Sequence, residues 1–303
     1  MERILLIETS TALCSAALAE DGVITAYKES SAPKAHASLT AVFIQEMLSE
    51  HGLTTSDCDA VCVSMGPGSY TGLRVGVSTA KGLCFGSGKP LLAVGTLDTL
   101  VAQAISEEIP DQAGNGGQTG ISDNATGPSN QTVVPRYIIP MIDARRMEVY
   151  TAVFAPVIPN DSNVIPSASN VIPSGSNVIP NDSNAIPGGS IVIPSGSNVI
   201  PGEAEGLPSY RQITETAPVI IDENSFAEYL EQGPVLFIGD GAGKCADVIR
   251  HPNAHFCQCY PKASAMLKPA LQAYKEKRFE DVAYFEPFYL KEFVATVSKK
   301  KLW

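Results

Sequence analysis

The segment Ser64–Gly76 constrains the fold more than any other part of the chain, because it joins a predicted strand to a predicted helix through several glycines. The apolar residues Ala60–Val63 are typical of a buried strand, and Leu73–Phe85 has apolar residues at helical spacing. Glycine accepts positive φ and lets a ligand or another backbone approach closely. Ser69 or Thr71 can cap the helix, and free N–H groups at a helix start can hold an anion. The segment therefore predicts either a tight, capped turn or a phosphate-binding turn.

The composition indicates a packed core and a strong acidic balance. The length of 303 residues predicts about two domains, and a hydrophobic fraction of 44% is ample for a packed core. The formal net charge of −11 disfavours stand-alone binding of nucleic acid, because phosphate contacts need clustered Lys and Arg. If the chain binds nucleic acid, we expect a partner protein to supply the basic surface. No apolar run reaches ~18 residues, so no membrane span is predicted.

The cysteines and the N-terminus both favour the cytoplasm. The chain has seven cysteines and no Cys-x-x-Cys motif, and Cys62 and Cys84 lie inside apolar runs, where a reduced cysteine acts as a small hydrophobic residue. This usage is typical of a reducing compartment. The sequence starts with the strand-like run Arg3–Ile7 and not with the pattern of a signal peptide.

Residues 1–109 are predicted to form one α/β unit in the order β-β-β-α-β-α-β-α. Asp21-Gly22 predicts a hairpin between the second and third strands, and Gly52 predicts the end of the first helix. Three antiparallel strands followed by α/β alternation are the plan of RNase H-like domains in the actin-like ATPase superfamily, an assignment made by analogy. The strands are expected at 4–7, 14–19, 23–29, 60–64 and 91–94, and the helices at 36–51, 72–86 and 97–105.

The rest of the chain is predicted to hold a flexible loop, a second unit and an insertion. Residues 110–131 contain almost no large apolar residues and predict the loop. Residues 132–155 and 208–303 predict a second RNase H-like unit, whose last helix is a candidate to pack on the first unit. Within it, strands are expected at 137–143, 148–154, 219–221 and 235–238, a helix start at 226–230 and a helix at 263–278.

Residues 156–207 form the predicted insertion, which consists of heptads rich in Pro, Ser, Asn and Gly. Seven heptads run from Val157 to Glu205, each with one proline, and a proline every seven residues forbids a continuous helix. Two interpretations stay open: a disordered product of repeat expansion, and a small stack of Val-Ile rungs. Protease resistance would favour the stack.

Two further segments have polar residues at predicted strand ends. Glu8-Thr9-Ser10 lies at the end of the first strand, where actin-like ATPases have a carboxylate and hydroxyls that meet the metal and the phosphate of a nucleotide, but ordinary turn capping is the favoured interpretation. Gly239–Lys244 is a second glycine-rich strand-to-helix turn. It lacks the spacing of a Walker A motif and has Cys245 where that motif needs Ser or Thr.

The remaining charged and histidine motifs have mainly structural interpretations. His251 and His255 have the i, i+4 spacing of a metal pair, but Pro252 argues against one continuous helix there. Asp143, Arg145, Arg146 and Glu148 form a charged turn, interpreted as surface ion pairs or as a contact with a partner. No Ser-His-Asp or Cys-His set emerges, and no catalytic nucleophile is predicted.

Together these motifs closely resemble the TsaB family, also called YeaZ, whose members are accessory subunits for threonylcarbamoyl-adenosine synthesis on tRNA. The resemblance covers residues 1–109, 132–155 and roughly 208–303, and leaves out the repeats. Its most specific parts are the thirteen-residue glycine turn and the Asp-Ala-Arg-Arg stretch. The matching residues are Ile7–Ser10, Ser64–Gly76, Met141–Tyr150 and Pro287–Lys291.

The resemblance implies a two-lobed actin-like fold that is not itself the transferase. The catalytic paralogue TsaD holds a metal through two histidines in Asn-His-Leu-Glu-Gly-His. Here the corresponding run is Val94-Gly95-Thr96-Leu97-Asp98-Thr99-Leu100, with Thr96 and Leu100 at the histidine positions. Leucine cannot ligate a metal and threonine is a poor ligand, so no metal, no catalytic residue and no cofactor are expected.

The resemblance also implies partners and a set of site residues. The partners would be a TsaD-like paralogue and a TsaE-like ATPase, with tRNA met only through the complex and a homodimer formed in isolation. The partner surface would use the helices at 36–50 and 72–86, with the insertion on the far side of the second lobe. Its candidate residues are Leu39, Phe43, Leu73, Val77, Leu83, Asp143, Arg145 and Arg146. The candidates for a vestigial phosphate site are Glu8, Thr9, Ser10, Gly66, Gly68, Ser69, Thr71, Gly72, Gly239, Gly241 and Gly243.

Two alternatives stay open at this point. An actin-like ATPase or a relative of sugar kinases would use Glu8 and the two glycine turns, and would bind nucleotide without a partner. A metallopeptidase would require stoichiometric zinc.

Overall fold

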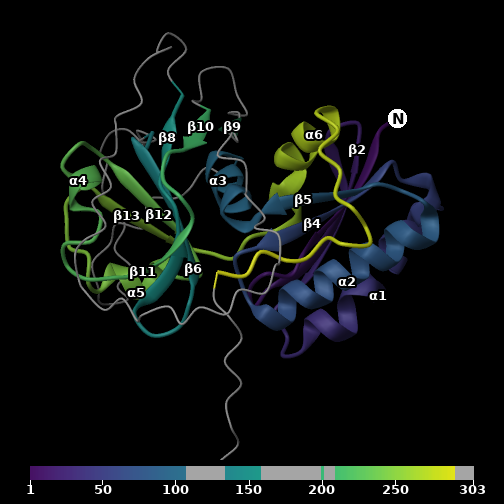
Figure 1. Ribbon diagram of the computed structural model, residues 1–303, viewed down its shortest axis with the longest axis horizontal. Coiled ribbons are helices and arrows are strands. Elements are labelled where there is room, and N and C mark those ends of the chain that lie inside the picture. The colour runs from purple at the N-terminus through teal and green to yellow at the C-terminus, as the bar shows by residue number, and fades with distance from the viewer. Residues whose placement is uncertain (107–133, 158–198, 201–208, 291–303) are drawn as a thin grey trace, which may run out of the picture.

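A computed structural model describes residues 1–106, 134–157, 199–200 and 209–290. The predicted loop at 110–131, the basic run Lys299–Lys301 and nearly all of the predicted insertion lie outside the described residues. The described part is a mixed α/β fold with two sheets, which confirms the predicted α/β class (Figure 1). None of its helices is long and apolar enough to cross a membrane.

The first sheet has the strand order β3-β2-β1-β4-β5. β1, β2 and β3 are antiparallel, and β4 and β5 run parallel to β1. The predicted hairpin at Asp21-Gly22 is confirmed, with both residues at positive φ. The predicted order of elements is also confirmed: β1 (Arg3–Glu8), β2 (Cys14–Glu20), β3 (Val23–Ser30), α1 (Ala35–Glu50), η1 (Thr55–Asp57), β4 (Ala60–Gly66), α2 (Tyr70–Ser87), β5 (Leu91–Gly95) and α3 (Thr96–Ser106).

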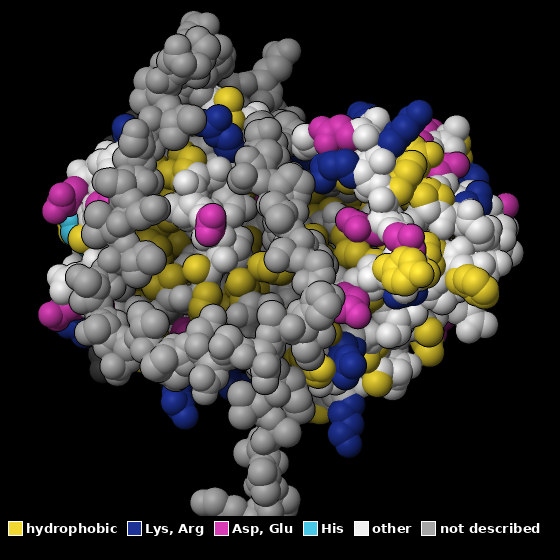
Figure 2. All heavy atoms as spheres, in the orientation of Figure 1, with side chains coloured by type: hydrophobic (Ala, Val, Ile, Leu, Met, Phe, Trp, Pro, Cys, Tyr) yellow, Lys and Arg dark blue, Asp and Glu magenta, His cyan; other side chains and the backbone are white. Residues whose placement is uncertain are grey.

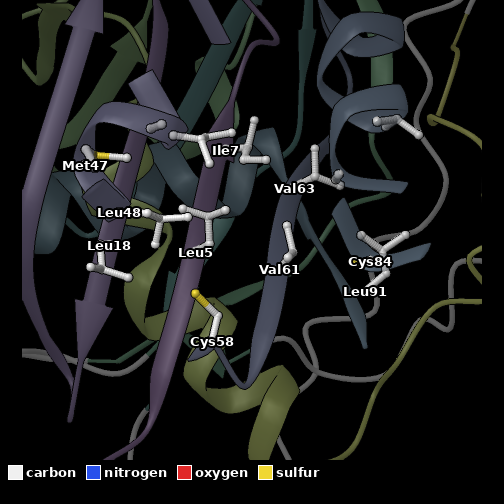
Figure 3. Packing of buried hydrophobic residues seen from close by; sticks show 14 of the residues in the cluster. Leu5, Ile7, Leu18, Met47, Leu48, Cys58, Val61, Val63, Cys84 and Leu91 are labelled. Carbon is white, nitrogen blue, oxygen red and sulfur yellow. The ribbon is translucent and has the colours of Figure 1, made fainter. Parts of the chain in front are cut away.

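Strand alternation sends successive residues of the first sheet into two separate cores. One face packs against α1 and α2, where Leu5, Ile7 and Val63 meet Met47 and other apolar residues of the helices (Figure 3). The opposite face packs against η2 (Ala263–Met266) and α6 (Leu267–Lys275), which come from the far end of the chain. The Ala263 N–H donates to Ser15 Oγ across this contact at 2.9 Å.

The second sheet contains eight strands among the described residues, in the order β11-β7-β6-β8-β10-β9, with β12 pairing both β6 and β13. α3 covers one face and lies between the two sheets (Figure 1), while α4 and α5 lie on the opposite face. The elements are β6 (Tyr137–Asp143), β7 (Glu148–Thr151), β8 (Phe154–Pro156), β9 (Val199–Ile200), β10 (Tyr210–Gln212), β11 (Ala217–Ile220), α4 (Ala227–Leu230), β12 (Val235–Gly239), α5 (Ala242–Ala246) and β13 (Ala254–Gln258).

Two predicted elements are divided in the structure. The strand predicted at 148–154 is two strands, because β7 pairs with β6 and β11 whereas β8 turns to pair with β10. The helix predicted at 263–278 begins as a 3-10 turn and becomes α6 only at Leu267, and Lys277 at positive φ lies beyond its end. Pro269 has no N–H and therefore suits the first turn of an α-helix.

The two ends of the predicted insertion lie at one place in the fold. β10 pairs with β8, which precedes the insertion, and with β9, which lies inside it. These strands are far from α1 and α2 in Figure 1.

Candidate functional site

The glycine-rich turn connects β4 to α2 and is capped as predicted. The Ser69 side chain accepts from the Gly72 N–H at 3.4 Å, and the Ser69 N–H donates to the Ser10 carbonyl at 2.6 Å. Ser69, not Thr71, is therefore the N-cap, since Thr71 lies inside α2 and is exposed. The structure thus brings together the predicted residues of the first turn and the Glu8–Ser10 segment.

The glycines of this turn lie against the chain's own backbone. A Cβ on Gly68 would be 2.3 Å from the Ser10 carbonyl oxygen, and one on Gly72 would be 2.0 Å from that of Thr9. The Thr9 hydroxyl donates to the Gly72 carbonyl at 2.8 Å. Of the two partners that glycines can admit, a ligand or another backbone, the structure shows the second.

The C-terminal segment closes the other side of the turn. Gly66 has φ +107°, and a Cβ there would be 2.8 Å from the Phe288 carbonyl oxygen. The Phe288 N–H donates to the Met65 carbonyl at 2.8 Å, and the Tyr289 ring lies 4.8 Å from the Tyr70 ring. The Pro287–Leu290 motif, singled out by resemblance alone, therefore packs on the glycine turn. Lys291 lies outside the described residues.

Glu8 is completely buried at the end of β1. Its Oε1 accepts from the Ser10 N–H at 2.6 Å, whereas Oε2 and the buried Ser10 hydroxyl have no hydrogen-bond partner among the described residues. Burial raises the pKa of Glu8 to about 7, and the hydrogen bond from the Ser10 N–H opposes this rise only in part. The carboxyl is therefore held in a medium that favours its neutral form.

The positions that the resemblance assigns to the histidines of TsaD belong to the core here. Thr96 is buried, and its hydroxyl shares a 2.9 Å hydrogen bond with that of Ser64. Leu100 is fully buried between the sheets, with its Cδ1 against Gly239. Both side chains are thus used for packing and internal hydrogen bonding.

The second glycine-rich turn joins β12 to α5 on the second sheet, as predicted. Gly239 has φ +132°, and a Cβ there would be 2.2 Å from the Met141 carbonyl oxygen. Gly241 lies against Val149 and Met141, and Gly243 donates its N–H to Gln258 Oε1 at 2.5 Å. This turn is likewise closed by neighbouring atoms of its own sheet.

Lys244 has a role that the sequence did not reveal. Its Nζ donates to Asp143 Oδ1, to the Arg146 carbonyl at 2.9 Å and to the Glu148 carbonyl at 2.7 Å. The charged turn predicted at 144–147 is thus held from α5, and Asp143 pairs with Lys244, not with Arg145 or Arg146. In the sequence, Gly243-Lys244 indicates only an incomplete Walker A motif.

Of the apolar residues predicted for a partner surface, two are wrong. Leu73 and Val77 are buried in the chain's own core beneath α2, so no surface partner can reach them. Leu39, Phe43 and Leu83 are half-buried.

Sequence analysis missed Phe85 on α2 and Val42 on α1, which are 87% and 39% exposed. α1 and α2 pack on one core, so these residues lie on neighbouring helices. Figure 2 shows hydrophobic side chains at the surface on this side of the molecule. The sequence could not show which apolar residues of α2 are exposed, because they occupy more than one face of the helix.

Three of the histidines, His36, His51 and His251, form hydrogen bonds within the chain. His36 Nε2 lies 2.7 Å from the Thr11 carbonyl, and His51 Nδ1 lies 2.8 Å from the Met47 carbonyl. His251 Nδ1 accepts from the Asn253 N–H at 3.1 Å, within its own loop. Among the residues that the structure describes, no group of three His, Cys, Asp or Glu side chains is arranged to hold a metal.

Comparisons with known proteins point to one family. A family model described as TsaD, tRNA N6-adenosine threonylcarbamoyltransferase, matches residues 27–113. The chain is 38% identical over 102 residues to the tRNA threonylcarbamoyladenosine biosynthesis protein TsaB of Escherichia coli (strain K12), and 39% identical over 104 residues to that of Haemophilus influenzae. Each match covers 34% of this chain, and they cover 44% and 43% of the two relatives, so the chain spans less than half the length of these curated relatives.

The fold has a solved counterpart. YeaZ from Pseudomonas aeruginosa matches with a TM-score of 0.64 and 20% identity, over 96% of this chain and 100% of that chain. The two sheets and the glycine turn thus define an α/β protein with the YeaZ fold. Together with the matches to TsaB over part of the chain, this confirms the predicted resemblance to the TsaB family.

Proposed function

We propose that this chain is a non-catalytic scaffold subunit of the complex that adds threonylcarbamoyl to tRNA. It pairs with a TsaD-like paralogue and works with a TsaE-like ATPase, and tRNA is met through the complex. The two sheets then correspond to two RNase H-like lobes, residues 1–109 and residues 132–155 with 208–303, and 156–207 is an insertion in the second lobe. The proposal places the complex in the cytoplasm.

The observation that carries the proposal is the burial of Thr96 and Leu100. At the positions where the resemblance places the metal-binding histidines of TsaD, this chain has a hydroxyl bonded to Ser64 and a leucine packed between the sheets. Neither can hold a metal. The catalytic chemistry of the complex is therefore assigned to the paralogue.

The two glycine turns support a scaffold over the alternative actin-like ATPase. The space against Gly68 and Gly72 is taken by the backbone of Thr9 and Ser10, and that against Gly239 by the Met141 carbonyl. A nucleotide phosphate would have to displace these atoms. We therefore expect no binding heat when ATP and Mg²⁺ are titrated into the isolated chain, and micromolar binding would favour the ATPase.

The outer faces of α1 and α2 are the proposed partner surface. Phe85 and Val42 are exposed there, and Gly82 and Gly86 of α2 have no neighbouring atoms within 4 Å of a built Cβ. A helix face with an exposed aromatic side chain and uncovered glycines allows another helix to approach closely. The same face would support a homodimer when the partner is absent.

A charge placed on this face tests the proposal. Phe85→Asp is expected to abolish co-elution with the TsaD-like paralogue in size-exclusion chromatography and to leave the thermal unfolding of the isolated chain unchanged. Ile220→Asp is the matched control, since Ile220 is 75% exposed on β11 of the other sheet. Equal assembly of Phe85→Asp and wild type would show that the surface is wrongly assigned.

A further inference from the structure

The turn between β6 and β7, which we call the arginine turn (residues 143–148), has an unusual backbone. Arg145 and Arg146 have φ of +71° and +50°, in the left-handed region that arginine rarely adopts. The Ala144 N–H donates to the Glu148 carbonyl at 3.0 Å, and the Glu148 N–H donates to the Arg145 carbonyl at 3.2 Å. Such a turn favours Asn-Gly, and left-handed backbone at other residues costs on the order of 1 kcal/mol each.

The arginine turn is held in place from outside. Lys244 of α5 donates to Asp143 Oδ1 and to the carbonyls of Arg146 and Glu148. Asp143 Oδ1 also accepts from the Arg145 N–H at 2.8 Å, and Asp240 Oδ1 accepts from the Asp143 N–H at 2.9 Å. Lys244 and Asp143 are therefore paired with each other and with backbone groups of the turn.

The two arginine side chains are not part of this internal network. Both are exposed, and among the described residues neither guanidinium forms an ion pair or a side-chain hydrogen bond. The backbone hydrogen bonds of the turn do not need an arginine side chain. Lys and Arg side chains project from the molecule at its lower edge on the β6 and α5 side (Figure 2).

We propose that the arginine turn binds phosphate groups of an RNA backbone, an inference that rests on the proposed function. The guanidinium group matches phosphate through two parallel hydrogen bonds, and a turn fixed by Lys244 holds two such groups with little flexibility of the backbone. The acidic chain as a whole repels RNA, with a net charge of −11. The two arginines are therefore expected to bind RNA only when the complex holds the RNA close to them.

The test measures tRNA binding by the complex of this chain with its TsaD-like paralogue. Fluorescence anisotropy of a labelled tRNA is recorded at several salt concentrations for wild type, for Arg145→Ala/Arg146→Ala and for Arg145→Lys/Arg146→Lys. The alanine variant is expected to bind roughly tenfold more weakly, and its salt slope to fall by roughly 2. The lysine variant keeps the charge, so it should keep the slope and lose affinity only in part.

The possible results are distinct. Unchanged affinity and slope in the alanine variant would overturn the inference and leave the proposed function untouched. Loss of the complex in the alanine variant, with an unchanged circular dichroism spectrum of the isolated chain, would show that the arginines contact a protein and would also overturn it. Failure of the wild-type chain to bind the paralogue would refute the proposed function instead, and the same variants would then be compared on the isolated chain with the same tRNA at low salt.

Discussion

The two glycine-rich turns begin alike and serve different ends. Each follows a buried strand, and each has glycines close to backbone carbonyls of its own half of the molecule, those of Thr9 and Ser10 just after β1 and that of Met141 in β6. The first leads into α2, a helix of 18 residues that covers a core and exposes Phe85. The second leads into α5, a helix of five residues whose Lys244 fixes the arginine turn. Similar turns thus lead into a long helix that covers a core in one half of the molecule and into a short helix that holds a charged turn in the other.

The largest effect is expected from filling the space behind either turn. Gly72→Ala places a methyl group 2.0 Å from the Thr9 carbonyl oxygen. Gly239→Ala places a methyl group 2.2 Å from the Met141 carbonyl oxygen, and Gly239 itself has φ +132°. Each should reduce the free energy of unfolding by at least about 3 kcal/mol in urea denaturation. Gly82→Ala in the same α2 has no neighbour within 4 Å and should stabilise by about 0.5–1 kcal/mol. Tolerance of both substitutions would mean that the turns hold open space for a ligand.

The next prediction compares a substitution on the buried face of α2 with one on its exposed face. Leu73→Ala removes a fully buried side chain and should reduce the free energy of unfolding by about 2–5 kcal/mol. Phe85→Ala removes a side chain that is 87% exposed and should change it by less than about 0.5 kcal/mol, while weakening the complex with the paralogue. A large loss of stability in Phe85→Ala would place this ring in the core and remove it from the partner surface.

The third effect concerns the buried carboxyl beside the first turn. Glu8 has a folded pKa of about 7 against an ordinary value of 4.5, so the folded state binds the proton more tightly than the unfolded state. Stability from this group is therefore present at low pH and is lost as the pH rises from about 4.5 through 7. Between pH 5 and pH 8, the free energy of unfolding of Glu8→Gln should gain up to about 3 kcal/mol relative to wild type. Parallel pH profiles in denaturant titrations would contradict the assigned burial.

The smallest effect tests the support of the arginine turn. Lys244→Met removes the hydrogen bonds from the ammonium to Asp143 Oδ1 and to the Arg146 and Glu148 carbonyls, and should cost about 1–2 kcal/mol because the ammonium is partly exposed. Lys275→Met, at the exposed end of α6, is the control and should have no measurable effect. Equal stability of the two variants would show that the turn does not depend on Lys244.

Local pattern predicted most of the fold. Apolar runs and glycines placed the strands of the first sheet, the Asp21-Gly22 hairpin and a helix cap at Ser69 or Thr71, because each depends on residues close in the sequence. What could not be predicted depends on distant contacts. The sequence named the last helix only as a candidate to pack on the first unit, and it gave no sign of the contact between Ala263 and Ser15, 248 residues apart, that puts η2 and α6 on the first sheet. Likewise, α2 has apolar residues on more than one face, so its sequence could not separate Leu73 and Val77 in the core from Phe85 at the surface.

The candidate site shows the same limit. The sequence located the glycines but not the atoms behind them, since a backbone and a phosphate both require glycine. Lys244 and the arginine turn are about a hundred residues apart in the chain and meet only because β6 and β12 are neighbours. Glu8 was identified by its place at the end of the first strand, whereas its complete burial could be seen only in the packed structure.

The most direct test of the central claim is co-purification of this chain with its TsaD-like paralogue, scored by size-exclusion chromatography beside a calorimetric titration of the isolated chain with ATP and Mg²⁺. The scaffold account predicts a stable complex with the paralogue and no heat from the isolated chain. A chain that ignores the paralogue and binds ATP would contradict it, and the two glycine turns would then be a working nucleotide site.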